Sequence, residues 1–243
     1  MPPSFDRSPQ PYLRIAGVFY LAIIVLGLFG EMFVRAKLVV SGDPAATAHA
    51  ISASKGLWRA GIAGDLLMHV FDIPVLVVLY LLLKPVNESL ALTATFINLI
   101  QTAVLAANKL SLLVPLYLLG GPSYLTAFSP AQLQTLSFVA IKAHGYGFAV
   151  GLIFFGVACL VRGHLMVKSG YVPKVYGFLM VLAGFSYLIN SFALLLAPTF
   201  AAALFPAILV PAFIGEFSFT LWMIVKGVNL AQWQQRMDQA PTR

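Results

Sequence analysis

The sequence predicts an all-α membrane protein, a bundle of six transmembrane helices with both termini in the cytoplasm. Of its 243 residues, 60% are hydrophobic and only 9% are charged, whereas a soluble domain is nearer half apolar and one quarter charged. The apolar residues form six stretches long enough to cross the hydrocarbon core of a bilayer. The basic residues gather at the ends of these stretches, where they would face lipid headgroups. The net charge of +7 therefore indicates a membrane surface and not nucleic acid.

The predicted spans cover residues 12–34, 59–83, 90–118, 131–161, 175–197 and 206–227. The first is longer than a signal-peptide core and lacks a small-x-small cleavage site, so we expect it to be retained. No soluble domain, low-complexity tract or internal repeat interrupts the pattern. Residues 1–243 are therefore predicted to form one six-span domain.

The longest connection, residues 35–58, is predicted to be an outer loop. In it, Asp43 can cap a helix whose first residue is Pro44, the order that favours a helix start. We therefore expect a short surface helix over 44–55.

Further helix boundaries follow from local signals. The Ser-Pro-Ala-Gln sequence at 129–132 is a capping box that opens the fourth span. Gly163 and residues 168–174 are predicted to form the turn before the fifth span, and Pro198 ends that span.

The basic residues set the predicted orientation. With the N-terminus inside, the outer segments carry only Arg35, Lys37, Lys55 and Arg59. The inner segments carry more than twice as many: Arg7, Arg14, Lys84, Arg162, Lys168, Lys174, Lys226, Arg236 and Arg243. Because cytoplasmic loops are enriched in Lys and Arg, this imbalance predicts cytoplasmic termini.

Several ionisable and amide residues lie inside the spans, where a charged side chain costs at least a few kcal/mol. They are Asp65, His69, Asp72, Asn98, Gln101, Asn108, Lys109, Lys142, His144, Asn190 and Glu216. In the predicted topology most lie about 10–15 Å below the outer ends of their spans, at 1.5 Å per residue. Intramembrane ionisable groups are functional by default, so this shared depth favours one polar site in the outer half of the bilayer.

Helical facing refines this set. Asp65, His69 and Asp72 fall within about 60° of one another on the second span. His144 shares its face with Gly147 and Gly151, a small-residue surface that permits close approach. Lys142 lies about 200° from His144, so we expect it to face away from the site.

Other polar residues have simpler interpretations. Glu31 and Arg35 are one helical turn apart, and we interpret them as a local pair outside the site. His49 and His164 are predicted to be solvated loop residues. Cys159, the single cysteine, is interpreted as a small buried hydrophobe and cannot form an internal disulfide.

Three kinds of site fit the polar residues. The first is a cavity that binds or transports a small or amphiphilic ligand, with proton coupling through Asp65, His69 or Glu216. The second is a zinc-dependent hydrolase of a lipid-like substrate, with His69, His144, Asp65 or Asp72, and Glu216 as candidate ligands. The third is a b-type haem between His69 and His144. No serine-hydrolase elbow, phosphate loop or dinucleotide fingerprint occurs.

Sequence fragments along nearly the whole chain match a known pattern. They are Arg14-Ile15-Ala16-Gly17, Gly42-Asp43-Pro44-Ala45-Ala46-Thr47, Leu57-Trp58-Arg59, Leu81-Leu82-Leu83-Lys84-Pro85-Val86-Asn87, His144-Gly145-Tyr146-Gly147, Phe154-Phe155-Gly156, Ser169-Gly170-Tyr171-Val172-Pro173, and Glu216 followed by Leu221-Trp222. In this order and spacing they resemble the bacterial six-helix membrane proteins called domain of unknown function 4386. The resemblance implies a bacterial cell membrane, a shared architecture and a shared site, and it implies no activity.

The resemblance points to five positions: Asp43, Thr47, Arg59, His144 and Glu216. The chain departs from the pattern at Ala50, where similar proteins tend to have Asn, which weakens the implication for the loop. His69, Lys109 and Lys142 are not part of the pattern, which lowers the weight of the haem and two-histidine zinc sites.

We therefore predict a polar cavity centred on Asp65, His144 and Glu216 that opens outward near Arg59 and residues 42–58. Its predicted ligand-binding residues are Arg59, Asp65, His69, Asp72, Asn108, Lys109, His144, Asn190 and Glu216, with Asp43 and Thr47 in the outer loop. The predicted partners are membrane lipid and a small or amphiphilic ligand. No cofactor is predicted, and the zinc-dependent hydrolase and the haem protein are the alternatives.

Overall fold

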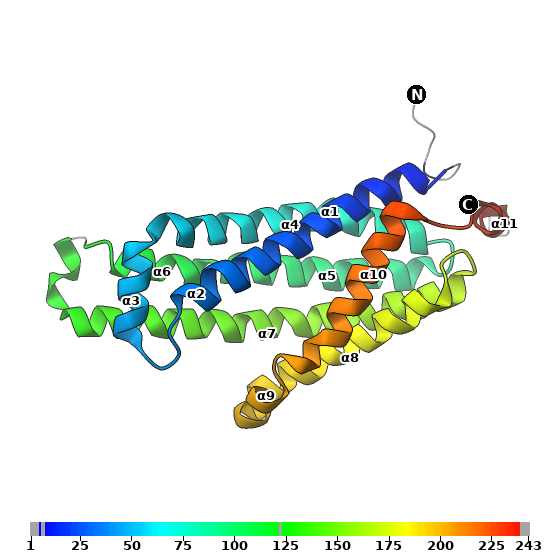
Figure 1. Cartoon of the computed structure of the whole chain (residues 1–243). Helices are drawn as coiled ribbons and strands as arrows, with labels where there is room; N and C mark the ends of the chain where they lie inside the picture. The colour runs from blue at the N-terminus through cyan, green and yellow to red at the C-terminus, as the bar shows by residue number, and fades with distance from the viewer. Residues whose placement is uncertain (1–4, 6–7, 122, 239–243) are drawn as a thin grey trace. The chain divides into compact units, whose positions relative to one another are not determined.

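The structure, a computed structural model, describes residue 5 and residues 8–121 and 123–238. Across this range the regular secondary structure is entirely helical, which confirms the predicted all-α class (Figure 1). Arg7 and Arg243, which contribute to the predicted orientation, lie outside the described residues.

Six helical segments are long and apolar enough to cross a membrane. They are Gln10–Leu38, Lys55–Leu83, Glu88–Leu118, Pro130–Ser169, Lys174–Leu196 and Ala207–Val225. Each overlaps one predicted span, so the prediction of six helices of this length and composition is confirmed.

Two of these segments are not single regular helices. The first comprises α1 (Gln10–Leu28), the π-helix η1 (Phe29–Arg35) and α2 (Ala36–Leu38). The third is α5 (Glu88–Asn108) followed by α6 (Leu110–Leu118), with a break at Lys109. At this break the hydrogen bonds shorten to three residues, from Lys109 N to Ala106 O and from Leu112 N to Lys109 O.

The fourth segment, α7 (Pro130–Ser169), is longer than predicted. Its start is confirmed, because Ser129 and Gln132 form the predicted capping box with reciprocal bonds of 3.3 and 2.8 Å. Gly163 was wrongly predicted to be in a turn, and His164 was wrongly placed in a loop. The helix continues through both residues and ends before Gly170, whose φ of 82° is in the left-handed region that favours glycine.

The remaining helices are α3 (Pro44–Ala53), α4 (Lys55–Leu83), the 3₁₀-helix η2 (Ser123–Ala127), α8 (Lys174–Leu196), α9 (Pro198–Leu204), the 3₁₀-helix η3 (Ala207–Leu209), α10 (Val210–Val225) and α11 (Leu230–Asp238). The short helix predicted in the outer loop is therefore confirmed as α3. His49 lies within it, exposed as predicted but helical and not in a loop. The end of the fifth span just before Pro198 is also confirmed.

The chain divides into two compact units. Unit 1 comprises Met1–Ala22, Phe71–Thr102 and Ala149–Arg243, and unit 2 comprises Ile23–Val70 and Ala103–Phe148.

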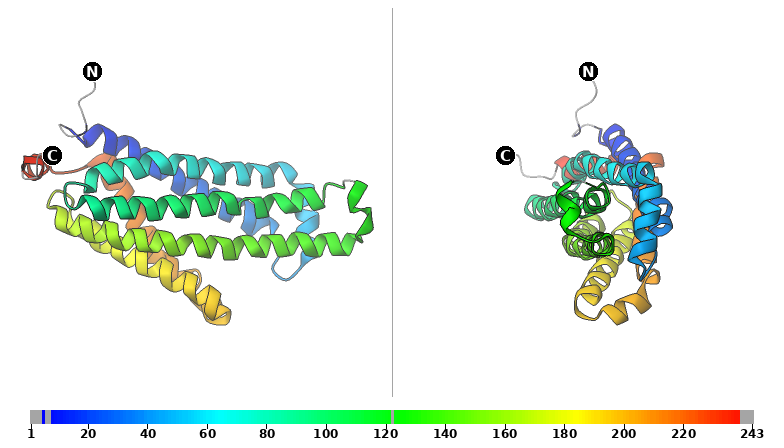
Figure 2. Two further views of the ribbon diagram at one scale, coloured as in Figure 1. Left: turned by 180° about the vertical axis from the view of Figure 1, so that it is seen from behind. Right: turned by 90° about the vertical axis from the view of Figure 1, so that its left-hand side faces the viewer.

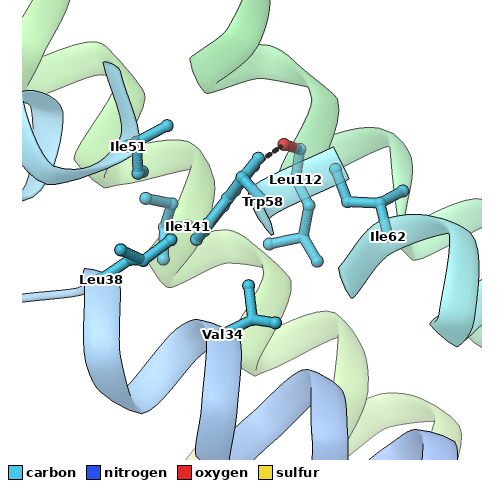
Figure 3. Packing of buried hydrophobic residues seen from close by; sticks show 7 residues of the cluster. All are labelled: Val34, Leu38, Ile51, Trp58, Ile62, Leu112 and Ile141. Carbon is cyan, nitrogen blue, oxygen red and sulfur yellow. Dashed lines mark hydrogen bonds between the residues drawn. The ribbon is translucent and has the colours of Figure 1, made fainter. Parts of the chain in front are cut away.

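The core of unit 2 surrounds Trp58 (Figure 3). The indole of Trp58 is 1% exposed, and its Nε1 donates a hydrogen bond to the Leu112 carbonyl at 2.8 Å. The other buried residues of this core are Val34, Leu38, Ile51, Ile62, Leu112 and Ile141. They come from η1, α2, α3, α4, α6 and α7, so one cluster joins six helical elements of the unit.

The loop of residues 35–58 is held onto this core by α3, which runs crosswise to α4 and α6 (Figure 1). As predicted, Asp43 caps α3, because its carboxylate accepts a hydrogen bond from Ala46 N at 2.9 Å. Thr47 is buried, and its hydroxyl accepts a hydrogen bond from Val40 N at 2.9 Å and donates to Asp43 O at 2.8 Å. Asp43 and Thr47 therefore shape the loop.

In unit 1, α8 lies side by side with α10, and α9 follows α8 closely (Figures 1 and 2). The contact between α7 and α8 depends on glycines. A Cβ atom on Gly163 would lie 2.6 Å from the Gly177 carbonyl oxygen, and a Cβ on Gly177 would lie 2.8 Å from the Gly163 oxygen. Small residues of this kind let two membrane helices approach to backbone contact.

In unit 1, aromatic packing joins the turn between α7 and α8 to α11. Tyr171, in the turn between α7 and α8, donates a hydrogen bond to the Leu82 carbonyl and packs edge-on against Trp233 of α11, with ring centroids 5.0 Å apart. Burial raises the pKa of Tyr171 above its usual value, so its hydroxyl also remains a donor at alkaline pH, where an exposed tyrosine ionises. Arg236 of α11 donates to the Pro85 carbonyl at 3.2 Å.

Replacing Gly163 by Ala is expected to lower the free energy of unfolding by about 1–3 kcal/mol, because the new methyl group must push α7 and α8 apart. Gly145→Ala is the matched control on the same helix, since a Cβ there meets nothing within 4 Å. Thermal unfolding in detergent should show a lower midpoint for Gly163→Ala only. Equal midpoints for the two variants would contradict the packing account.

Candidate functional site

The densest group of buried charges surrounds Asp65 in unit 2. Its side chain is 1% exposed, and its Oδ2 accepts a hydrogen bond from Arg35 Nη1 at 2.7 Å. Lys109 Nζ lies 2.9 Å from the same oxygen, and the Lys109 side chain is 2% exposed. One carboxylate oxygen is thus shared by two cations from different helical segments.

Arg35 reaches Asp65 because of the π-helix η1. A π-helix closes its turns with bonds from residue i to i+5, and here Ala36 N donates to Glu31 O. The interpretation of Glu31 and Arg35 as a pair is confirmed by a 2.8 Å contact. Arg35 also contacts Asp65, which the interpretation as a local pair did not include, because the wider turn changes the direction of the side chains that follow it. Regular helical periodicity contains no sign of this change.

His144 is joined to Asp65 through Lys109. Lys109 Nζ lies 3.3 Å from His144 Nε2, and Asn108 Nδ2 donates to the His144 carbonyl at 2.8 Å. An ammonium group can only donate, so His144 Nε2 is the acceptor and its ring proton is on Nδ1. The break after Asn108 places Asn108 and Lys109 where both contact α7. We call Arg35, Asp65, Lys109 and His144 the Asp65 cluster.

One glycine leaves room for Asp65 of this cluster, and a second leaves room for Asn108 beside it. A Cβ atom on Gly30 would lie 2.5 Å from Asp65 Oδ1. A Cβ on Gly147 would overlap the Asn108 amide, which confirms the predicted close approach at the small-residue face of His144.

Two buried atoms near these groups on α4 have no hydrogen-bond partner within the described residues: Asp65 Oδ1 and His69 Nε2. Leaving a buried polar atom unpaired costs about 1–3 kcal/mol. These atoms lie one helical turn apart on one face of α4, as predicted.

A separate network in unit 1 surrounds Glu216 of α10. Tyr20 donates a hydrogen bond to Glu216 Oε2 at 2.8 Å, and Tyr187 donates to Oε1. Both oxygens therefore have a partner. The two tyrosines were not predicted to be part of a site, although a tyrosine inside a span needs a partner for its hydroxyl.

A second network in unit 1 joins α4, α5 and α7. Asp72 Oδ2 accepts hydrogen bonds from Asn98 Nδ2 at 3.1 Å and from Thr102 Oγ1. Asn98 also donates to Gln101 Oε1 at 2.7 Å and accepts from Arg162 Nη1 at 2.5 Å. Arg162 was predicted to face headgroups at a span end, and that was wrong. Its side chain turns into the unit and is 4% exposed.

The remaining candidates form none of the hydrogen bonds or ion pairs of these networks within the described residues. Lys142 is exposed as predicted, with Nζ 5.2 Å from the centre of the Phe138 ring. Arg59 is exposed on α4. Asn190 is half-buried on α8, and no hydrogen bond of its side chain is found within the described part of the chain.

The candidate metal ligands do not converge. In the described residues, no three His, Cys, Asp or Glu side chains are grouped as a metal ion requires. Between Asp65 and His144 lies the Lys109 ammonium, within 2.9 and 3.3 Å of them. A cation already bridges these two side chains, so they do not fit as a zinc pair in this arrangement.

Comparison with known families decides the relationship. The sequence model of the family described as domain of unknown function (DUF4386) matches residues 15–227. The chain belongs to this family. It is also similar to an uncharacterised protein of the archaeon Archaeoglobus fulgidus, with 26% identity over 171 residues that cover 70% of this chain and 86% of that protein. No solved structure matches the chain.

Within this DUF4386 protein, the tyrosine contacts of Glu216 give a direct test. Tyr20→Phe and Tyr187→Phe each remove one donor from a buried carboxylate and should each lower the free energy of unfolding by about 1–3 kcal/mol. Tyr146→Phe, at an exposed position of α7, is the control and should be neutral. Thermal unfolding in detergent measures the midpoints of all three variants. A midpoint for Tyr146→Phe as low as those of the other two would contradict a stabilising role of the Glu216 hydrogen bonds.

Proposed function

We propose that this protein binds a small or amphiphilic ligand through an anionic group at the Asp65 cluster and transports it across the membrane. The observation that carries the proposal is the sharing of one buried carboxylate oxygen by Arg35 and Lys109. Buried ionisable groups in membrane spans commonly mark ligand and ion pathways.

The charges of the cluster favour an anion. Two cations, with side chains 14% and 2% exposed, face one buried carboxylate. Glu31 also pairs with Arg35, but its side chain is 62% exposed, and contacts with exposed groups are screened by solvent. The buried part therefore carries an excess of one positive charge, which attracts an anionic ligand.

A ligand anion could exchange with Asp65. It would take over the donors of Arg35 and Lys109, while the released Asp65 carboxylate would bind a proton (hydronium) from the aqueous solution. The anion and one proton would enter the site together, and the reverse exchange would release both. Asp65 Oδ1 and His69 Nε2, the unpaired atoms on α4, supply hydrogen-bonding capacity for the neutral or zwitterionic part of such a ligand.

The orientation belongs to the same proposal. The excess of Lys and Arg in the segments assigned to the inner side favours cytoplasmic termini in a bacterial cell membrane. In that orientation the start of α4 and the end of α6 lie at the outer surface, and the ligand enters from the outer leaflet.

The alternative, a zinc-dependent hydrolase of a lipid-like substrate, requires an open metal position between its ligands. The Lys109 contact to both Asp65 and His144 favours the ligand site over that alternative. A haem between His69 and His144 is likewise disfavoured, because His144 Nε2 already accepts from Lys109.

Three probes with the same ten-carbon chain test the preferred charge: decanoate, decylphosphocholine and decyltrimethylammonium. We expect decanoate to raise the unfolding midpoint of the purified protein most. Lys109→Gln should weaken decanoate binding at least about tenfold, because it removes one partner of a buried charge. Lys142→Gln, which removes an exposed lysine, is the control and should bind as the unchanged protein does.

Other outcomes would contradict the proposal. Equal stabilisation by the cationic probe, or equal binding by both lysine variants, would remove the charge argument. Stoichiometric zinc in the purified protein that is lost in His144→Ala would support the hydrolase instead.

A further inference from the structure

Unit 2 has an apolar surface groove between α4 and α6 with a volume of about 440 Å³. Its walls include Ile62 and Leu66 of α4 and Leu113 and Leu116 of α6. None of the residues that line it belongs to the Asp65 cluster, so this inference does not rest on the proposed function.

The polar residues of the groove lie at one end. Arg59 is the fifth residue of α4, and Tyr117 is the penultimate residue of α6. Because α4 begins and α6 ends at the same boundary of their membrane spans, both side chains lie at headgroup level. From Arg59 to Leu66 the groove follows seven residues of helix, about 10 Å at 1.5 Å per residue. The groove is therefore lined by apolar side chains along most of its length and carries a cationic side chain at one end.

The charges at this end favour an anionic partner. Arg59 is exposed, and Lys55, one turn earlier on the same face of α4, is exposed as well. The acidic residue of α4 in unit 2, Asp65, is buried and already paired with two cations. The guanidinium of Arg59 therefore has no carboxylate partner on its own helix in this unit and matches the geometry of a phosphate.

We infer that this groove holds one acyl chain of an anionic phospholipid whose phosphate is bound by Arg59. Lipid tails already surround the protein, so apolar burial alone gives little preference for any one lipid. Selectivity must come from the headgroup charge at Arg59 and Lys55 and from the fit of the chain in the groove. The lipid is then a bound partner at a defined position.

Native mass spectrometry of the full chain from an equimolar mixture of phosphatidylglycerol and phosphatidylcholine with identical acyl chains tests this inference. We expect the protein to retain phosphatidylglycerol preferentially. Arg59→Gln should reduce that preference about fivefold, the effect of one basic residue near an anionic membrane surface. Arg14→Gln removes an exposed arginine of α1 outside the groove and should leave the preference unchanged.

A second pair of variants tests the groove itself. Ala63 lines the groove and is exposed, so Ala63→Trp should fill it and abolish retention of either lipid at this site. Ala103→Trp places the same side chain at an exposed position of α5 outside the groove and should have no effect. Unfolding midpoints establish that both variants are folded.

Binding in the groove and general attraction to a basic surface give different outcomes. Equal losses in Arg59→Gln and Arg14→Gln would show general surface attraction and overturn the inference. Unchanged retention in Ala63→Trp would also overturn it. Lys109→Gln should retain phosphatidylglycerol normally, whereas Arg59→Gln should keep the response to decanoate, so failure at one site is distinguishable from failure at the other.

Discussion

The ion pairs of Asp65 are the constraint on which unit 2 depends. A carboxylate that is 1% exposed requires strong partners, and each partner reaches it through a departure from regular helix. The π-helix η1 directs Arg35, and the break between α5 and α6 directs Lys109. Gly30 leaves the space that Asp65 Oδ1 occupies. The irregular backbone of these spans is therefore concentrated where the charges meet, with the Trp58 core holding the segments together.

In unit 1, both carboxylate oxygens of Glu216 and Oδ2 of Asp72 accept hydrogen bonds from neutral donors. Tyrosine hydroxyls bond Glu216, and an amide and a threonine hydroxyl bond Asp72. Such groups pair with the oxygen atoms without adding charge, in the manner of the interhelical hydrogen bonds that stabilise membrane bundles. The partners of Asp65 are instead two cations, so the buried group around it carries an excess of positive charge. That difference is the physical reason for placing the ligand at the Asp65 cluster.

The positions suggested by the family resemblance divide between architecture and chemistry. Asp43 caps α3, and Thr47 closes the loop before it through its hydroxyl. Both therefore maintain the loop of residues 35–58 on the core of unit 2. Arg59, which follows the buried Trp58, stands at the charged end of the groove, and His144 accepts from Lys109. Asp43 and Thr47 thus stabilise the loop, whereas Arg59 and His144 supply charged and polar groups to the two candidate binding sites of this unit.

The sequence by itself determined the class, the six spans, the cap of α3 and the start of α7, because these depend on local apolar length and on contacts within four residues. It also predicted one polar site that holds Asp65, Lys109 and His144 together with Asp72, Asn190 and Glu216, since depth along a helix follows from residue number. The contacts between Asp65, Lys109 and His144 agree with that grouping, whereas Glu216 and Asp72 have other partners. Only the tertiary structure decided their partners. The contact of Arg35 with Asp65 depends on a π-helix, and the contact of Arg162 with Asn98 depends on a long side chain that turns inward. The hydrogen bonds of Glu216 come from tyrosines that lie 196 and 29 residues away in the sequence. Such contacts depend on the distance between helices and on side-chain reach, which helical periodicity does not encode.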